Sequence, residues 1–246
     1  MQYRLCHKRI MNKPNALMFG ATGAIGSAIV EWFTAQQYEV IAISRTQPER
    51  CLSSNITWLK WDGSQNINVF SNLKKGSINA VVWAQGANFN DDINTFEVNE
   101  HQSMYNANVI YILLSLQALI KQNLLSNSAR LCVISSIWQN LARQNKLSYC
   151  ITKSALQGLV QSLAIDLGSS GHLINAVLPG ALDTPMTRAN LDEHQLRRLE
   201  EMTPLGSLST LDDVCNLVGF LCSQNNTGIT GQFIAADGGF SYARIL

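Results

Sequence analysis

The chain has 246 residues, of which 46% are apolar and 14% are charged, and its formal net charge is +1. This balance, without an acidic or basic tail, excludes the electrostatic signature of a nucleic-acid-binding or membrane-surface protein. The length suits one α/β domain with a sizeable core. No Pro/Gly linker, repeat or low-complexity tract divides the chain, which therefore predicts a single domain.

Six cysteines are scattered along the chain without a CxxC pair, and no histidine lies at metal-ligand spacing. This pattern predicts reduced thiols and no metal site. The basic N-terminus lacks the apolar run of a signal peptide, and no segment reaches the roughly 18 uninterrupted apolar residues of a membrane span. We expect a cytoplasmic protein in which residues 1–15 form a loose extension before a domain at 16–246.

Short apolar runs alternate with longer amphipathic stretches along the whole chain. The strand candidates are residues 16–20, 39–44, 55–61, 78–84, 129–135, 173–179 and 231–236. The helix candidates are residues 25–37, about 97–122, about 148–168 and 210–223. This rhythm predicts βα units in an α/β fold, a single-domain Rossmann-type doubly wound parallel sheet with helices on both faces.

One charged segment, at residues 187–209, interrupts the apolar alternation. A mobile substrate lid at about 185–208 fits this composition, because α/β enzymes select substrates with such loops. An ordinary solvated helix fits it equally well. The sequence leaves both interpretations open.

A glycine cluster in the sequence FGATGAIGSAI lies between the first strand and the first helix. It places Gly20, Gly23 and Gly26 at a strand-to-helix turn, where free N–H groups and the helix dipole favour a pyrophosphate. A tight structural turn is the alternative for an isolated cluster of this kind. Its position at the first βα junction favours a dinucleotide site.

The end of the second strand reads AISRT and carries no acidic residue for a free ribose 2′-hydroxyl. Arg45, with Ser44 beside it, is suited to a 2′-phosphate, so we favour NADP(H), with NAD(H) as the alternative. An exposed arginine without a specific role remains possible here. Asp62, after the third strand, is a candidate partner for the adenine amino group or a plain turn aspartate.

Tyr149 and Lys153 lie four residues apart in SYCITKSAL, and Ser136 follows a strand thirteen residues upstream of the tyrosine. At i and i+4 on one helix, the two side chains share a face. At about 4 Å and an effective dielectric near 20, the attraction is roughly 4 kcal/mol. This predicts a tyrosine pKa lowered from about 10 to near 7, which suits general acid–base catalysis. Ser136 is expected to hold the substrate oxygen.

These motifs resemble the short-chain dehydrogenase/reductase family, in its branch of about 250 residues that is similar to 3-oxoacyl-carrier-protein reductases. The pieces appear in family order over nearly the whole chain: GATGAIG, Asn108 in NANVIY, Ser136, YCITK, INAVLPG with Asn175, and TGITGQFIAADGG. The resemblance implies a catalytic tetrad of Asn108, Ser136, Tyr149 and Lys153. Asn108 is expected to hold a water that relays protons past the lysine.

The resemblance also implies an NAD(P)-dependent oxidoreductase that acts on a small or carrier-bound carbonyl compound, with the two long helices pairing in a homodimer or homotetramer. Nucleic-acid and membrane partners are not expected. The expected cofactor contacts are Gly20, Thr22, Gly23, Ala24, Ile25, Gly26, Ser44, Arg45, Asp62, Ala84, Gln85, Gly86, Tyr149, Lys153, Pro179, Gly180, Leu182 and Thr184.

Three departures from the family pattern concern the cofactor end. Ala24 replaces the middle glycine of the loop and adds a methyl group, and Phe19 replaces the threonine before the first glycine. The family's Asn-Asn-Ala-Gly reads Trp83-Ala84-Gln85-Gly86, in which Trp83 is expected to pack in the core. A catalytically silent nucleotide-binding or scaffolding homologue, and an imine or pterin reductase on the same scaffold, are the alternatives to a carbonyl reductase.

Overall fold

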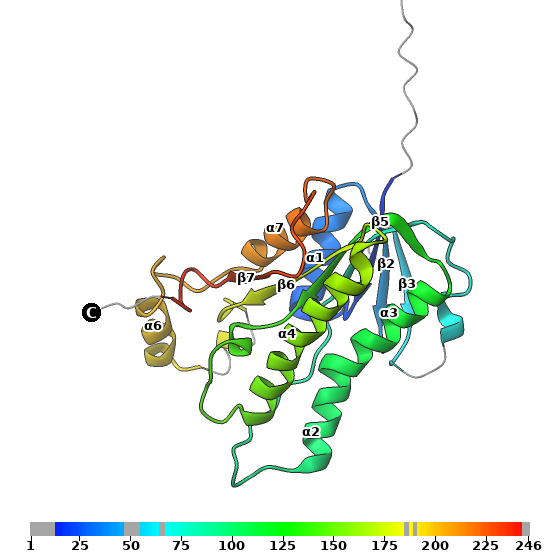
Figure 1. Ribbon diagram of the computed structural model, residues 1–246. Coiled ribbons are helices and arrows are strands. Elements are labelled where there is room, and N and C mark those ends of the chain that lie inside the picture. Colours follow the sequence, from blue (N-terminus) through cyan, green and yellow to red (C-terminus); the bar gives the residue numbers. More distant parts are fainter. Residues whose placement is uncertain (1–12, 47–54, 64–66, 185–186, 189–190, 243–246) are drawn as a thin grey trace, which may run out of the picture.

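The computed structural model describes residues 13–46, 55–63, 67–184, 187–188 and 191–242. It contains a seven-stranded sheet in the order β3-β2-β1-β4-β5-β6-β7, and every neighbouring pair is parallel (Figure 1). The strands are β1 (Asn15–Phe19), β2 (Glu39–Ser44), β3 (Ile56–Lys60), β4 (Ile78–Trp83), β5 (Leu125–Ile134), β6 (Leu173–Pro179) and β7 (Phe233–Ala236). The strand order reverses between β1 and β4, where such sheets bind ligands.

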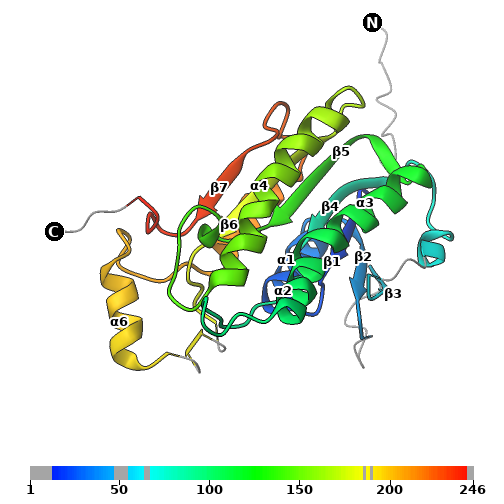
Figure 2. The ribbon, with the colours of Figure 1, turned by 60° about the horizontal axis from the view of Figure 1, so that its bottom comes forward.

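Helices cover both faces of the sheet, which confirms the predicted fold class (Figures 1 and 2). One face carries α2 (Val98–Tyr105), the π-helical segment η2 (Asn106–Ile110), α3 (Tyr111–Lys121) and α4 (Leu147–Gly168). The other carries α1 (Ala24–Ala35) and α7 (Leu211–Leu221), which pack on each other. The helix α6 (Glu193–Glu201) stands apart from both layers. Two short 3₁₀ turns, η1 (Ile67–Phe70) and η3 (Ile137–Gln139), complete the described elements.

Most predicted elements match the structure within a few residues, and two boundaries differ. β5 begins at Leu125, before the predicted apolar run, because Leu125 pairs with Ile78 and the register then shifts before the next paired residues. The predicted extension at residues 1–15 is too long, since Asn15 belongs to β1 and its N–H donates to Asn79 Oδ1 at 2.9 Å. Residues 1–12 lie outside the described part.

The helix predicted at about 97–122 forms one run with an internal change of pitch. Val98–Lys121 is long and apolar enough to cross a membrane, but half of its most apolar window is buried inside the protein. That is the position of a core helix. Its π-helical turn at Asn106–Ile110 packs against α4 and is hydrogen-bonded through Asn108 to Ala87, in the segment that follows β4. Such turns are frequent at functional sites.

Two departures from the family pattern pack on each other in the core. The rings of Phe19 and Trp83 are stacked, with centroids 5.8 Å apart and an interplanar angle of 2°. Trp83 is fully buried, as predicted, and its Nε1 donates to Ser115 Oγ at 2.8 Å. Trp61 and Phe70 meet the edge of Phe19. An apolar cluster therefore supports the strand ends where the family has polar side chains.

Candidate active site

Two adjoining clefts lie at the carboxyl ends of the strands and share Asn88. The first, of about 850 Å³, includes the predicted cofactor residues Gly20, Thr22, Gly23, Ser44, Arg45, Asp62, Ala84, Gln85 and Gly86. The second, of about 1050 Å³, includes the predicted residues Ala24, Ile25, Ser136, Tyr149, Gly180, Leu182 and Thr184. We call them the nucleotide cleft and the substrate cleft. Most of the predicted site residues are therefore brought together.

Gly26, Lys153 and Pro179 are predicted cofactor residues that do not line either cleft. Gly26 lies beneath the glycine loop, where a Cβ atom would come within 2.1 Å of the Gly20 carbonyl oxygen. Pro179 ends β6 and is buried. Lys153 is buried behind the cleft wall.

The glycine loop folds tightly because its first glycine has a positive φ. Gly20 has φ +75°, and a Cβ atom there would come within 2.4 Å of the Gln85 backbone nitrogen. The loop is thereby held against the segment that follows β4. Gly23 caps α1 without a side-chain acceptor, and the first turn of α1 carries no acidic residue. The first N–H groups of this helix are suited to a phosphate.

Gln85 stands where the family has an alanine, and both polar atoms of its side chain are buried without a hydrogen-bond partner among the described residues. The residue lines the nucleotide cleft. An amide buried in this way is costly unless something pairs with it. The observation fits a cleft that is completed by a polar ligand.

Arg45 and Asp62 lie at the ends of β2 and β3, at the far side of the nucleotide cleft. Arg45 is exposed and makes no ion pair in the described ranges. Ser44 is buried, and its hydroxyl donates to the Thr46 carbonyl. The Ser44 hydroxyl is thus engaged locally, whereas Arg45 lines the cleft without a carboxylate partner among the described residues.

Tyr111 is a cleft residue that the sequence did not indicate. It lines the nucleotide cleft, and a Cβ atom on Gly63 would come within 2.5 Å of its ring. Burial raises the pKa of Tyr111, and the negative charge of Asp62 adds to this effect. Within an apolar helix a tyrosine gives no signal of this role. The same holds for the other lining residues of this run, Ser103, Asn106, Ala107, Ile110 and Leu114.

Ser136, Tyr149 and Lys153 converge as predicted. Ser136 follows β5 by two residues, and its Oγ accepts from the Trp138 N–H at 3.3 Å. Tyr149 and Lys153 occupy α4, with the lysine Nζ 5.6 Å from the centre of the tyrosine ring. The lysine donates to the Ile134 carbonyl at 3.1 Å. Both side chains therefore lie at the end of β5.

Burial controls the protonation of this pair. It raises the pKa of Tyr149 above its ordinary value of 10.0, although a hydrogen bond with Ser136 acts in the opposite direction. Burial also lowers the pKa of Lys153 to about 8. The predicted lowering of the tyrosine pKa is therefore wrong for the protein alone. Removing the phenolate and the ammonium from water costs more than their attraction returns at this separation.

Asn108 is buried within the π-helical turn, and its amide makes three hydrogen bonds to neighbouring segments. Its Oδ1 accepts from the Ala87 N–H at 2.8 Å, and its Nδ2 donates to the Ala87 carbonyl at 3.1 Å and to Thr152 Oγ1 at 2.9 Å. The side chain fastens the segment after β4 to α4. Both amide N–H groups and one lone pair of Oδ1 are thereby used, and the expected water-holding role stays a prediction.

The start of α4 is fixed by a segment far away in the sequence. The buried carboxylate of Asp91 accepts from the Ser148 N–H at 3.0 Å. Lys146, also buried, donates to Asn88 Oδ1 at 2.6 Å, and its Nζ lies 5.7 Å from the centre of the Tyr149 ring. Neither contact is visible in the sequence, since a lysine three residues before a tyrosine is an ordinary helix-start residue.

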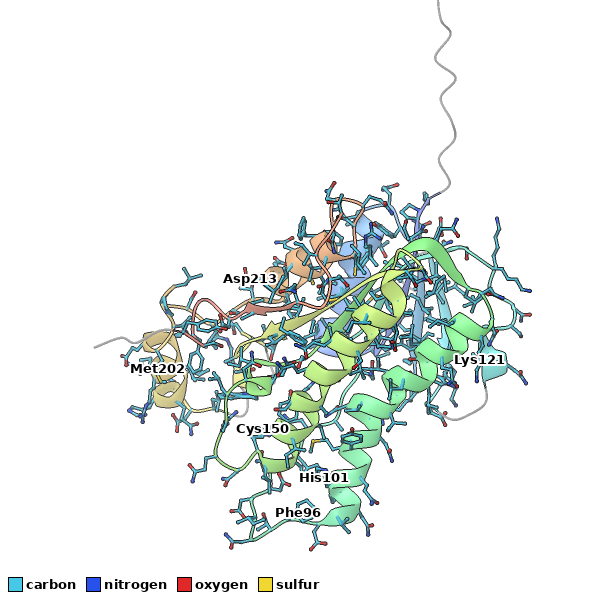
Figure 3. The ribbon with its side chains drawn as sticks, viewed as in Figure 1. Phe96, His101, Lys121, Cys150, Met202 and Asp213 are labelled. Atoms are coloured by element: carbon cyan, nitrogen blue, oxygen red, sulfur yellow. The ribbon has the colours of Figure 1, made fainter. Side chains whose placement is uncertain are left out.

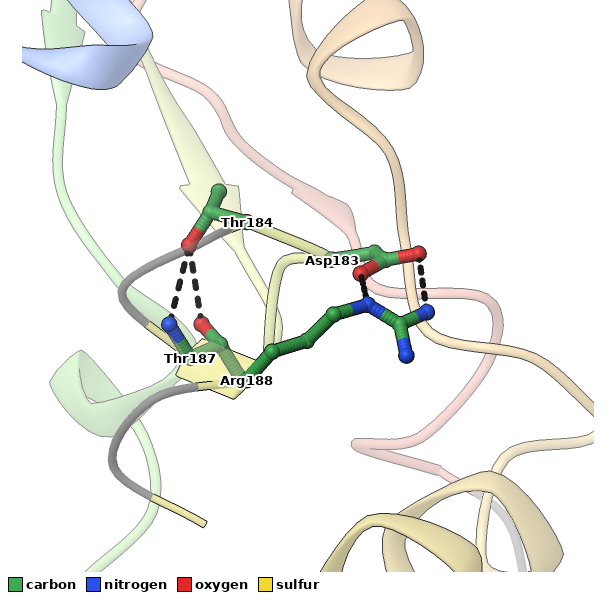
Figure 4. A network of polar contacts seen from close by, with 4 residues as sticks. All are labelled: Asp183, Thr184, Thr187 and Arg188. Atoms are coloured by element: carbon green, nitrogen blue, oxygen red, sulfur yellow. Dashed lines mark hydrogen bonds and ion pairs between the residues drawn. The ribbon is translucent and has the colours of Figure 1, made fainter.

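The segment after β6 forms one wall of the substrate cleft. Its backbone is held by Thr184, whose Oγ1 accepts from the Thr187 N–H at 3.2 Å, and by a double ion pair between Asp183 and Arg188 (Figure 4). Asn175 of the INAVLPG motif is fully buried within β6. Its amide binds the Ile229 carbonyl and the Gln232 N–H.

The charged segment predicted as a lid contains α6, which begins with a capping box between Asp192 and Gln195. One side of this region lines the substrate cleft through Leu191, Gln195, Arg198, Leu199 and Met202. Figure 3 labels Met202 at the end of α6, away from the sheet. The described part of the segment therefore contains a helix and lines the cleft, and its action as a mobile lid stays a prediction. Residues 185–186 and 189–190 of the predicted lid lie outside the described residues.

Comparisons with known proteins agree with this geometry. The family profile described as enoyl-(acyl carrier protein) reductase matches residues 20–241. The 3-oxoacyl-[acyl-carrier-protein] reductase FabG of Escherichia coli is 26% identical over 91% of this chain and 96% of its own. A gluconate 5-dehydrogenase from Burkholderia cenocepacia in complex with NADP and tartrate has a TM-score of 0.86 at 20% identity, covering 95% of this chain and 97% of its own. A short chain dehydrogenase from Leptospira borgpetersenii with bound NAD+ has a TM-score of 0.83 at 20% identity, covering 98% and 100%.

The burial of Lys153 predicts a pH-dependent stability. Its folded pKa of about 8 lies below the ordinary 10.5, so the unfolded chain binds more protons between these values and the free energy of unfolding rises with pH. Relative to Lys153→Met, the wild type should gain on the order of 2 kcal/mol between about pH 8 and pH 9.5 in urea titrations. The exposed Lys121→Met variant is the control and should show no such trend. A flat difference for Lys153→Met would show that the ammonium is solvated.

Proposed function

This chain belongs to the short-chain dehydrogenase/reductase family and is an NAD(P)-dependent oxidoreductase, and we propose that it transfers hydride between NADP(H) and a carbonyl or secondary alcohol with Tyr149 as general acid/base. The observation that carries the proposal is the convergence of Ser136, Tyr149 and Lys153 on a cleft that adjoins the glycine loop. No residue of this proton-handling group is missing.

The chain's own residues account for the proton in this reaction. When bound, the nicotinamide supplies the hydride that reaches the carbonyl carbon. Tyr149 donates its hydroxyl proton to the carbonyl oxygen, and Ser136 hydrogen-bonds the same oxygen as negative charge develops there. Because burial raises the pKa of Tyr149, the phenol is protonated at neutral pH and can transfer its proton as negative charge develops on the carbonyl oxygen. The Lys153 ammonium stabilises the resulting phenolate.

The residues that would hold the dinucleotide fit it. The open start of α1 suits the pyrophosphate, and the close approach of Gly20 to Gln85 leaves room for no side chain at the loop. Gln85 lines the nucleotide cleft, and its side-chain amide is buried without a hydrogen-bond partner among the described residues. Ala24 lines the adjoining substrate cleft and is not among the residues that line the nucleotide cleft. The altered loop is therefore compatible with binding.

Arg45 supports the preference for NADP(H). It lines the nucleotide cleft without an ion-pair partner among the described residues, and no acidic side chain follows β2 there. A guanidinium binds a phosphate with two parallel hydrogen bonds. NAD(H) is the alternative, and NADPH and NADH binding to the Arg45→Ala variant distinguishes the two cofactors.

The proposal extends to assembly and location. Exposed apolar side chains of α3 and α4, Leu113, Ile120, Ile151 and Ile165, support a homodimer or homotetramer that pairs these helices. The cysteines of the described part, Cys132, Cys150, Cys215 and Cys222, carry free thiols, which fits action in the cytoplasm. The substrate is a small or carrier-bound carbonyl compound.

Tyr149→Phe tests the catalytic role. Loss of the proton donor should lower NADPH oxidation with a responsive ketone by at least about 100-fold, while NADPH binding measured by fluorescence stays within roughly twofold. Tyr38→Phe is the control, because Tyr38 packs on Phe33 and lines neither cleft. Full activity of Tyr149→Phe would remove the proposed chemistry. A wild type that binds NADPH but reduces no ketone in a broad panel would favour the silent homologue.

Arg45→Ala tests the cofactor preference. Removing a charged partner of the 2′-phosphate should weaken NADPH binding by about tenfold or more and NADH binding by less than about twofold. Lys60→Ala removes an exposed cation at the end of β3 outside the nucleotide cleft and is the matched control. Equal losses for the two nucleotides in Arg45→Ala would show that this arginine does not read the phosphate.

A further inference from the structure

The substrate cleft carries an excess of positive charge. Arg143, Lys146 and Arg198 line it, and among the described lining residues Asp237 is the one carboxylate. The Asp237 carboxylate accepts from the N–H groups of Gly239 and Ser241, at 2.9 and 2.8 Å. It is thus engaged in its own turn, and the described residues offer no ion-pair partner to the three cations.

Lys146 is the best placed of these cations. It is 9% exposed, and its Nζ lies 5.7 Å from the centre of the ring of the proposed proton donor, Tyr149. Its hydrogen bonds go to Asn88 Oδ1 at 2.6 Å and, at 3.4 Å, to the Phe89 carbonyl. An ammonium has three donors, so one is left over. Both recorded partners are neutral, and a buried charge in such surroundings is costly.

Arg143 lies in the loop between η3 and α4, with its guanidinium carbon 5.9 Å from the centre of the Trp138 ring. Stacking on this ring is a common way to hold an arginine in position. The positive charge of Arg143 is close enough to oppose protonation of Lys146, whose pKa is lowered mainly by burial and next by Arg143. Asp91 acts in the opposite direction, but its carboxylate is bound to the Ser148 N–H.

Resting on the proposed function, we propose that the substrate cleft selects oxo compounds that carry an anionic group, which Arg143 and Lys146 bind. An anion removes the repulsion between the two cations and supplies the partner that the buried ammonium lacks. Because Lys146 lies over the ring that delivers the proton, the anionic group is within a few bonds of the reacting carbonyl. Trp138 and Phe240, in edge contact with each other, give the cleft an apolar wall for the rest of the substrate.

A matched pair of compounds tests this selection without turnover. We would titrate 4-oxopentanoate and its neutral amide, 4-oxopentanamide, into the full-length protein by calorimetry, both alone and with saturating NADP⁺, which cannot reduce a ketone. The acid should bind at least about tenfold more tightly than the amide, as for a charge-assisted hydrogen bond. Raising the salt from about 0.05 to 0.5 M should reduce this preference, since such interactions are screened.

Three variants locate the effect. Arg143→Gln and Lys146→Gln should each bring the preference for the acid below about threefold and leave binding of the amide unchanged. Arg197→Gln removes an equal charge from α6, on a side chain that pairs with Glu193 at 3.1 Å outside the cleft, and should keep the preference. Arg143 is exposed, so its variant is informative even if Lys146→Gln loses stability.

Equal binding of the two compounds, no detectable binding of either, or an equal loss in Arg197→Gln would overturn the inference. None of these results depends on catalysis. A protein that binds the acid selectively but oxidises no NADPH would contradict the proposed function and leave the anion site standing. A protein that reduces neutral ketones as well as oxo acids would contradict the anion site and leave the proposed function standing.

Discussion

The burial of a lysine ammonium behind the proposed proton donor is the constraint on which the site depends. Lys153 has the Ile134 carbonyl as its recorded acceptor, so the surrounding segments must hold their places. Asn108 does this by joining Ala87 to Thr152. Gly86 has no side chain because a Cβ atom would lie 3.0 Å from Asn108 Oδ1 and 3.9 Å from the lysine Nζ. Gly86, Asn108 and the π-helical turn together hold the segment after β4 against α4, beside the buried Lys153.

The cofactor end shows how the same fold tolerates unusual residues. Phe19 and Trp83 depart from the family pattern together, and they stack face to face beneath the strand ends. The two departures therefore belong together, because the contact between Phe19 and Trp83 puts an apolar pair where the family pattern has polar residues. Gln85 adds a buried amide beside the nucleotide cleft, without a hydrogen-bond partner among the described residues. Aromatic packing thus replaces polar residues beneath the glycine loop. The loop itself still lies close to the segment after β4, at Gly20 and Gln85.

Features set by local pattern could be predicted from the sequence, and features set by tertiary contact could not. Apolar periodicity predicted the parallel sheet, and the spacing of Ser136, Tyr149 and Lys153 predicted that Ser136 and Tyr149 share a cleft with the lysine beside the tyrosine ring. Lys146 and Tyr111 were missed because their roles come from Asn88 and Gly63, which are distant in sequence. The direction of the Tyr149 pKa was also missed, since spacing gives proximity to a charge but not the depth of burial.

We expect the Tyr149 phenol to become a stronger acid when the cationic nicotinamide ring of NADP⁺ enters the cleft. A tyrosinate absorbance titration, taken as the difference between the wild type and Tyr149→Phe, measures this pKa directly. In the protein alone it should lie above 10.0, and with saturating NADP⁺ it should fall by at least about one, because added positive charge favours the phenolate. An unchanged or higher pKa in the complex would contradict the account.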